Sequence, residues 1–104
     1  MIKVSIIYPN EEGSRFDHDY YKTTHMPLVV RHLGPRGLIK IGIEKGVAGG
    51  APGEKPPYHC IGGLFFESET AYRSAAEGVG SVLRDDVPKF TDVAAIRQIS
   101  EVVE

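Results

Sequence analysis

Residues 16–35 read FDHDYYKTTHMPLVVRHLGP, and this stretch predicts the helix around which the fold is arranged. Asp17 is suited to cap the helix, because its carboxylate can accept hydrogen bonds from the free amides of the first turn. Phe16, directly before it, can pack on Tyr21 one turn later as a hydrophobic staple. The Gly-Pro pair that closes the stretch ends the helix, since glycine favours the position after the last turn and proline cannot continue it.

One side of this helix is predicted to face the core. At about 100° per residue, that side carries Tyr21, His25, Leu28, Val29 and His32, whereas Lys22, Met26 and Arg31 lie elsewhere. Pro27 has no amide hydrogen, and its ring presses on the carbonyl four residues earlier. A bend or a loosening of the helix is therefore expected next to His25.

The rest of the chain alternates between strand and helix patterns. Alternating or continuous apolar residues predict strands over 1–8, 38–45, 58–66 and 93–103. A second amphipathic helix is expected from the cap Ser68 through Leu83, weakened by two internal glycines, and a charged connection follows over 84–92. Residues 46–57 hold four glycines and three prolines, which predicts a long loop; a binding loop or lid and a disordered hairpin tip are both compatible with it.

The order β-α-β-β-α-β predicts an α+β fold of the ferredoxin-like, split βαβ type. In that fold a four-stranded antiparallel sheet carries two helices on one face. A chain of 104 residues is expected to form a single domain over 1–104. The third strand and Ile7 of the first carry apolar side chains on both faces of the sheet, so the face without helices needs a cover. We expect a homodimer built through the sheet faces.

Composition excludes several classes of function. The 12 basic and 14 acidic residues give a net charge of −2 without a basic block, which argues against a nucleic-acid partner. No apolar run reaches the roughly 20 residues that a bilayer requires, so we expect no membrane segment and a cytoplasmic protein. The single cysteine, Cys60, excludes an internal disulfide and a thiolate cluster, and no motif has the spacing of a metal site.

His25 is the residue best suited to chemistry. An imidazole has a reference pKa of about 6.5 and can give and take a proton near neutral pH. Tyr21, one turn earlier, could hydrogen-bond the ring or a substrate oxygen. The alternative for His25 is a buried histidine whose ring is satisfied by a backbone carbonyl.

Two neighbours on the third predicted strand, His59 and Cys60, must point to opposite faces of the sheet, so one at most faces a pocket. A cysteine and a histidine facing each other there could form a nucleophilic or acid–base pair. A lone strand cysteine is, however, commonly a small core residue. Tyr8, at the end of the first strand, could add a hydroxyl to the same pocket or pack at the strand end.

The motif FDHDYYKTTHMPLV, with a strand ending in Tyr-Pro before it, resembles the EthD family of small dimeric α+β barrel proteins. The hallmark of that family is a phenylalanine, paired tyrosines and a His-x-Pro in the first helix. The resemblance covers essentially the whole chain and implies a pocket between the sheet and the helices, lined by His25, the histidine of His-x-Pro. It does not by itself assign a reaction, because one fold hosts many activities.

With the resemblance, these residues predict a cofactor-independent enzyme that acts on a small hydrophobic, aromatic or lactone compound through acid–base chemistry. It would be an isomerase, cyclase, decarboxylase or oxygenase. The residues expected to act are His25 and Tyr21, and those expected to contact the ligand are Tyr8, Tyr20, Leu28, Val29, His59 and Ile61. Two alternatives stay open: a non-catalytic small-molecule-binding protein that serves a degradation or biosynthesis pathway, and a haem protein with His25 or His59 as axial ligand.

Overall fold

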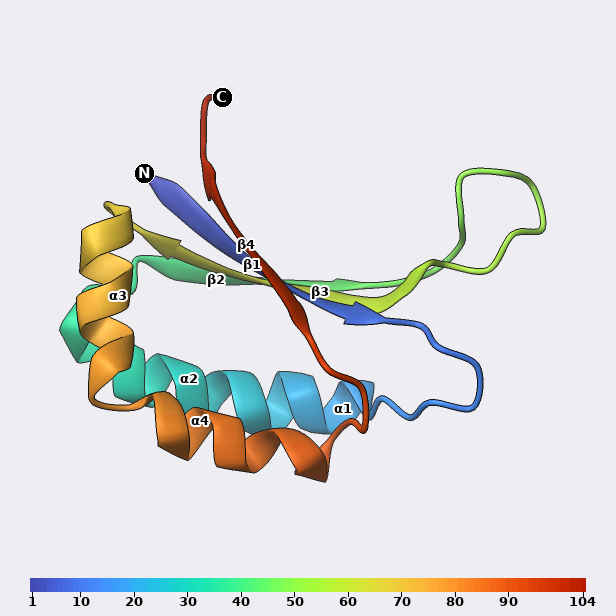
Figure 1. The fold of residues 1–104 in the computed structure, drawn as a ribbon, viewed down its shortest axis with the longest axis horizontal. Helices are drawn as coiled ribbons and strands as arrows, with labels where there is room; N and C mark the ends of the chain where they lie inside the picture. Colours follow the sequence, from blue (N-terminus) through green and yellow to red (C-terminus); the bar gives the residue numbers. More distant parts are fainter.

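The computed structural model describes residues 1–104 and contains one antiparallel sheet of four strands. The strands lie in the order β2-β3-β1-β4, and their bounds are β1 Ile2–Pro9, β2 Lys40–Lys45, β3 Tyr58–Phe66 and β4 Ile96–Glu101. All helices cover the same face of this sheet, while the other face carries none (Figure 1). The predicted α+β, ferredoxin-like order is confirmed.

Helical segments connect β1 to β2 and β3 to β4. The first connection holds α1 (His18–Tyr20), a π-helical turn (Tyr21–His25), α2 (Met26–Leu33) and a 3₁₀ turn (Gly34–Arg36). The second holds α3 (Glu69–Glu77), α4 (Gly80–Asp86) and a 3₁₀ turn (Val87–Lys89). No helix is both long enough and apolar enough to span a bilayer.

The start of the first helical connection follows the sequence prediction. The Asp17 side chain accepts a hydrogen bond from the amide of Tyr20 at 3.0 Å. The rings of Phe16 and Tyr21 lie 5.3 Å apart, centroid to centroid. Both the cap and the staple are therefore confirmed, and they fix where the chain turns from β1 into the helix.

The expected loosening next to His25 takes the form of the π-helical turn, in which the Met26 amide donates to the carbonyl of Tyr21, five residues back. This wider turn holds one more residue than an α-turn and so rotates everything after it. As a result Met26 is buried, at 1% exposure, and the prediction that it lies away from the core was wrong. Leu28 and His32, predicted for the core side, are only half-buried.

The second predicted helix is two helices. Gly78 and Val79 separate α3 from α4, and the chain changes direction sharply between them (Figure 1). Helix α4 continues to Asp86, so the expectation that a charged connection begins at Arg84 was wrong. The first residues expected in the second and fourth strands also lie outside the observed strands, which begin at Lys40 and Ile96.

Alternation in the strands separates a core face from an outer face. The core face packs on the helices through side chains such as Val4, Ile6, Leu64 and Phe66, all buried. The opposite face carries Ile7, paired across the sheet with Ile61 and Ile96. The sheet therefore keeps an apolar strip on the face that no helix covers.

Candidate functional site

His25 lies at the end of the π-helical turn and is a buried residue, with 5% of its surface exposed. Its Nδ1 lies 2.9 Å from Oδ2 of Asp86, the last residue of α4. The Tyr20 hydroxyl donates to the other oxygen of the same carboxylate at 2.8 Å. The Lys89 ammonium lies 3.7 Å from that oxygen. A histidine, a carboxylate and a tyrosine from two helical connections thus form one hydrogen-bonded group.

The surroundings set the protonation states of this pair. Burial lowers the pKa of His25 below its ordinary value, and although Asp86 opposes this shift, the net direction is downward. Burial tends to raise the pKa of Asp86, but hydrogen bonds from His25 and Tyr20 hold it below its ordinary value. At neutral pH the imidazole is therefore neutral and the carboxylate charged, so Nδ1–H is the donor to Asp86. The lone pair of His25 is on Nε2.

A cavity of about 70 Å³ lies between the sheet and the helices, and His25 lines it together with Tyr8 and Val29. Most of its other lining residues are apolar, namely Ile6, Leu33, Leu64, Tyr72, Ala76, Leu83 and Val87. Because Nδ1 of His25 is bonded to Asp86 and Nε2 has no hydrogen-bond partner within the protein, Nε2 is the nitrogen free to meet a ligand.

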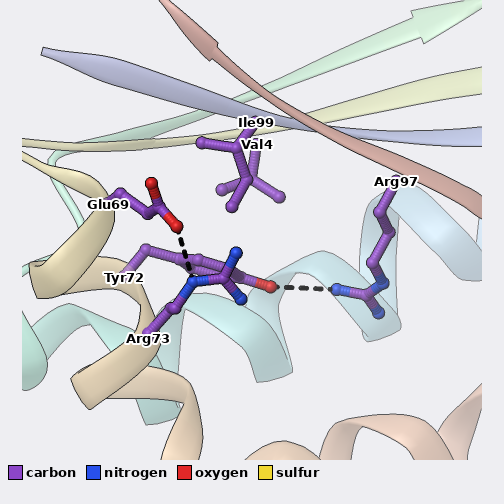
Figure 2. Close-up of a pocket in the computed structure, with 6 residues that line it drawn as sticks. All are labelled: Val4, Glu69, Tyr72, Arg73, Arg97 and Ile99. Atoms are coloured by element: carbon purple, nitrogen blue, oxygen red, sulfur yellow. Dashed lines mark hydrogen bonds and ion pairs between the residues drawn. The ribbon is translucent and has the colours of Figure 1, made fainter.

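A larger groove of about 340 Å³ lies beside this cavity and shares Tyr72 and Arg97 with it. Figure 2 shows the groove between the sheet and α3, with the side chains of Arg97 from β4 and Tyr72 from α3 pointing toward one another. The Arg97 Nη1 donates to the Tyr72 hydroxyl at 3.2 Å. This hydrogen-bonded pair stands between the groove and the cavity.

The cavity limits what the site can hold. An apolar cavity of about 150 Å³ holds one benzene molecule, and the cavity beside His25 has about 70 Å³. A ligand of that size or larger that reaches His25 must therefore also occupy part of the groove. A haem with His25 as axial ligand is far too large for this cavity of about 70 Å³. No group of three or more histidine, cysteine, aspartate or glutamate side chains is placed to hold a metal ion.

Several of the predicted site residues meet around His25. Tyr8 is buried and lines the cavity, and burial raises the pKa of its hydroxyl to about 12. Tyr21 stacks on the His25 ring with centroids 5.5 Å apart, but its own buried hydroxyl has no hydrogen-bond partner. Tyr20 acts on the site through Asp86 and does not line the cavity.

Other predicted ligand contacts lie elsewhere. Ile61 faces the outer side of the sheet, because Cys60 and its other neighbour on β3 take the inward positions, and it does not line this cavity. A register shift after Tyr8 turns His59 against Phe16, 5.7 Å away between centroids, and toward the Ser14 hydroxyl at 2.7 Å. Leu28 is half-buried and lies outside the cavity lining.

Cys60 is fully buried among core side chains, and burial raises the pKa of its thiol to about 11. A thiol with a raised pKa is a poor nucleophile at neutral pH, and no histidine is hydrogen-bonded to it. The structure therefore favours the core interpretation of Cys60.

The sequence prediction missed Asp86 and Arg97. Asp86 could have been found by helical spacing, because it follows Val79 and Leu83 on the apolar side of α4, where a carboxylate needs a partner. Arg97 lies two residues before Ile99 on β4, so both residues lie on the face of the sheet that the helices cover. A charged residue in an inward strand position is a comparable signal.

Residues 12–94 match the model of the EthD domain family. Among solved structures, the chain is similar to an EthD-like protein from Ralstonia eutropha JMP134, with 39% identity and a TM-score of 0.94 over 99% of this chain and 92% of the other. An EthD family protein from Bacillus halodurans C-125 has 20% identity and a TM-score of 0.74, with 99% of each chain covered. HapK from Hahella chejuensis shares the fold with 12% identity and a TM-score of 0.62, over 99% of this chain and 93% of the other. No curated protein matches the chain.

Proposed function

The chain belongs to the EthD family, and from that premise we propose that it is a cofactor-independent enzyme in which His25 moves a proton on a small, mostly apolar substrate. The observation that carries the proposal is the buried hydrogen bond from His25 to Asp86, 2.9 Å long, at the wall of a cavity. A neutral imidazole whose second nitrogen is held by a carboxylate is the arrangement of a general base.

The proposed step is proton transfer at a carbon next to a carbonyl group. Nε2 of His25 takes the proton, the electron pair of the broken C–H bond forms a new C=C bond, and the π electron pair of the carbonyl moves onto its oxygen, which gives an enolate. The imidazolium that results is stabilised by the Asp86 carboxylate, as in other histidine–carboxylate pairs. Where the substrate has a double bond conjugated with the enolate, return of the proton from Nε2 to the far (γ) carbon of that dienolate completes an isomerisation, and no external oxidant or reductant is needed.

Hydrogen exchange tests this step without knowledge of the natural substrate. Small ketones, lactones and aromatic β-dicarbonyl compounds are incubated with the protein in D₂O, and loss of the proton signal is followed by NMR. His25→Gln should slow catalysed exchange by about 10²–10⁴-fold, the usual contribution of a general acid or base. His32→Gln is the matched control, since His32 lies on α2 without a side-chain hydrogen bond.

Exchange that is equally fast in the His25→Gln protein would remove His25 from the mechanism. Compounds that bind with His25-dependent affinity but never exchange a proton would instead support the alternative, a binding protein that carries a hydrophobic metabolite. Both outcomes are read from the same samples.

We also propose that two copies associate through the outer face of the sheet. Ile7, Ile61 and Ile96 form an apolar strip there, and Ile96 is 53% exposed in the single chain. Association of two such strips would remove them from water. Light scattering should give twice the chain mass of 11.4 kDa, and a monomer mass at micromolar concentration would refute the dimer.

A further inference from the structure

Two arginines, Arg84 from α4 and Arg97 from β4, line the edge of this largely apolar cavity, and both residues are exposed. No carboxylate is among the lining residues. Neither arginine takes part in an ion pair. Arg73, in the adjoining groove, is by contrast paired with Glu69 at 2.8 Å (Figure 2).

Arg97 has hydrogen-bonding capacity to spare. A guanidinium group carries five N–H donors, and the structure uses one of them, toward the Tyr72 hydroxyl. The Arg97 side chain lies at the junction of the groove and the cavity, because it lines both. Its remaining donors are therefore available to a molecule that enters His25's cavity from the groove.

The positive charge of Arg97 also affects the pKa values of two buried residues, His25 and Tyr8. It is one of the influences on the pKa of His25, which it lowers together with burial. It opposes the effect of burial on the pKa of Tyr8. The Arg97 guanidinium and the His25 imidazole are therefore close enough to interact electrostatically, and both line the cavity.

We propose that the ligand is a small organic acid, whose carboxylate binds Arg97 beside Tyr72 while its apolar part enters the cavity toward His25. This inference rests on the proposed function and adds the class of substrate to it. A planar guanidinium is matched in shape to a carboxylate and can bind it with two parallel hydrogen bonds. The apolar wall formed by Ile6, Leu64 and Leu83 suits the body of such a molecule.

An anchor of this kind has a chemical use. A carboxylate held at Arg97 fixes one end of the substrate, so the carbon to be deprotonated is presented to Nε2 of His25 in one orientation. Because β4 is an edge strand, an inward arginine could instead serve only to prevent pairing with other sheets. The two roles differ in one measurable property, the preference of the protein for anions over neutral molecules of the same shape.

Binding of benzoate, crotonate and cyclohexanecarboxylate is compared with binding of the three matching amides by calorimetry at pH 7. We expect at least one acid to bind about tenfold more tightly than its amide, which corresponds to about 1.4 kcal/mol. Arg97→Gln should abolish this preference, and Arg97→Lys should keep part of it. Arg31→Gln, an exposed arginine of α2 outside the cavity, removes the same charge and should leave the preference unchanged.

Three results would overturn the proposal: equal binding of acids and amides, an acid preference that survives in Arg97→Gln, or no binding of any of the three acids. An Arg97→Gln protein that aggregates while keeping its acid preference would identify the edge-protection role. Thermal unfolding of each variant shows that it is folded.

His25→Gln separates this inference from the proposed function. That variant should bind the acids with the wild-type preference although its proton exchange is slowed by about 10²–10⁴-fold. If the acid preference depends on Arg97 but no exchange is ever observed, the acid site stands and the enzyme proposal fails. If exchange depends on His25 but acids are not preferred, the acid site fails and the enzyme proposal stands.

Discussion

Gly62 is predicted to be the position on β3 where a methyl group is least tolerated. A Cβ atom there would overlap the Tyr21 hydroxyl oxygen, and its next neighbours are Cζ of Tyr21 at 3.3 Å and Cε of Met26 at 3.7 Å. Tyr21 is 1% exposed and packed among aromatic rings, so it has little room to retreat. Forcing extra volume into a packed core costs about 1–3 kcal/mol.

The substitution Gly62→Ala should therefore lower the free energy of unfolding by about 1–3 kcal/mol, measured by urea denaturation. For a chain of this size each kcal/mol lowers the melting temperature by about 4–8 °C. Gly63→Ala is the matched control. The nearest atom to its Cβ is the end of the flexible Lys3 side chain, Cε at 2.8 Å, which can move into solvent.

A second substitution tests the cause. The Tyr21 hydroxyl is buried near the Tyr8 hydroxyl but makes no hydrogen bond of good geometry, so Tyr21→Phe removes the colliding atom with little loss of hydrogen bonding. In the Tyr21→Phe background Gly62→Ala should cost at least about 1 kcal/mol less than in the wild type. If the two substitutions are additive, or if Gly62→Ala costs no more than Gly63→Ala, the packing of Tyr21 on β3 is not as the structure places it.

Three further predictions concern the His25–Asp86 pair and the start of α3. Asp86→Asn removes the carboxylate that raises the pKa of His25 against burial, so an NMR titration of the imidazole should show a still lower pKa; an unchanged or higher value would contradict the assignment. The pKa of folded His25 lies below its ordinary value of about 6.5, so just below that pH the unfolded chain binds more protons than the folded chain. The free energy of unfolding should therefore decrease as the pH is lowered through this range. Burial also lowers the pKa of His18, so His18 contributes to the same decrease. In His25→Gln the decrease in the free energy of unfolding should be smaller than in the wild type, and the difference between the two proteins is the contribution of His25. Ser68→Ala removes the side-chain oxygen that accepts from the Ala71 amide at 3.1 Å and should lower the free energy of unfolding by about 1 kcal/mol in urea, whereas no change would mean that α3 is capped otherwise.

The parts of the fold that depend on local chemistry were predictable from the sequence. Alternation located β1 and β3 to within a residue, and the cap and staple at Asp17 and Phe16 placed the start of the first helical connection. The parts that failed depend on backbone irregularities that no periodicity encodes. A prediction that places residues at 100° intervals around an α-helix assigns them to the wrong face once one turn is widened. Met26, which follows the π-helical turn, was predicted to lie away from the core for this reason but is buried.

The same irregularities build the candidate site. The π-helical turn places His25, Met26 and Val29 together on the buried side of the first helical connection. The break at Gly78 redirects the second connection, so that α4 brings Asp86 to within 2.9 Å of His25. A helix that continued straight past Gly78 would keep the direction of α3 and could not bring Asp86 to the imidazole (Figure 1). The break between α3 and α4 is therefore a condition for the acid–base pair, whereas helix propensity described Gly78 only as a weak point in one continuous helix.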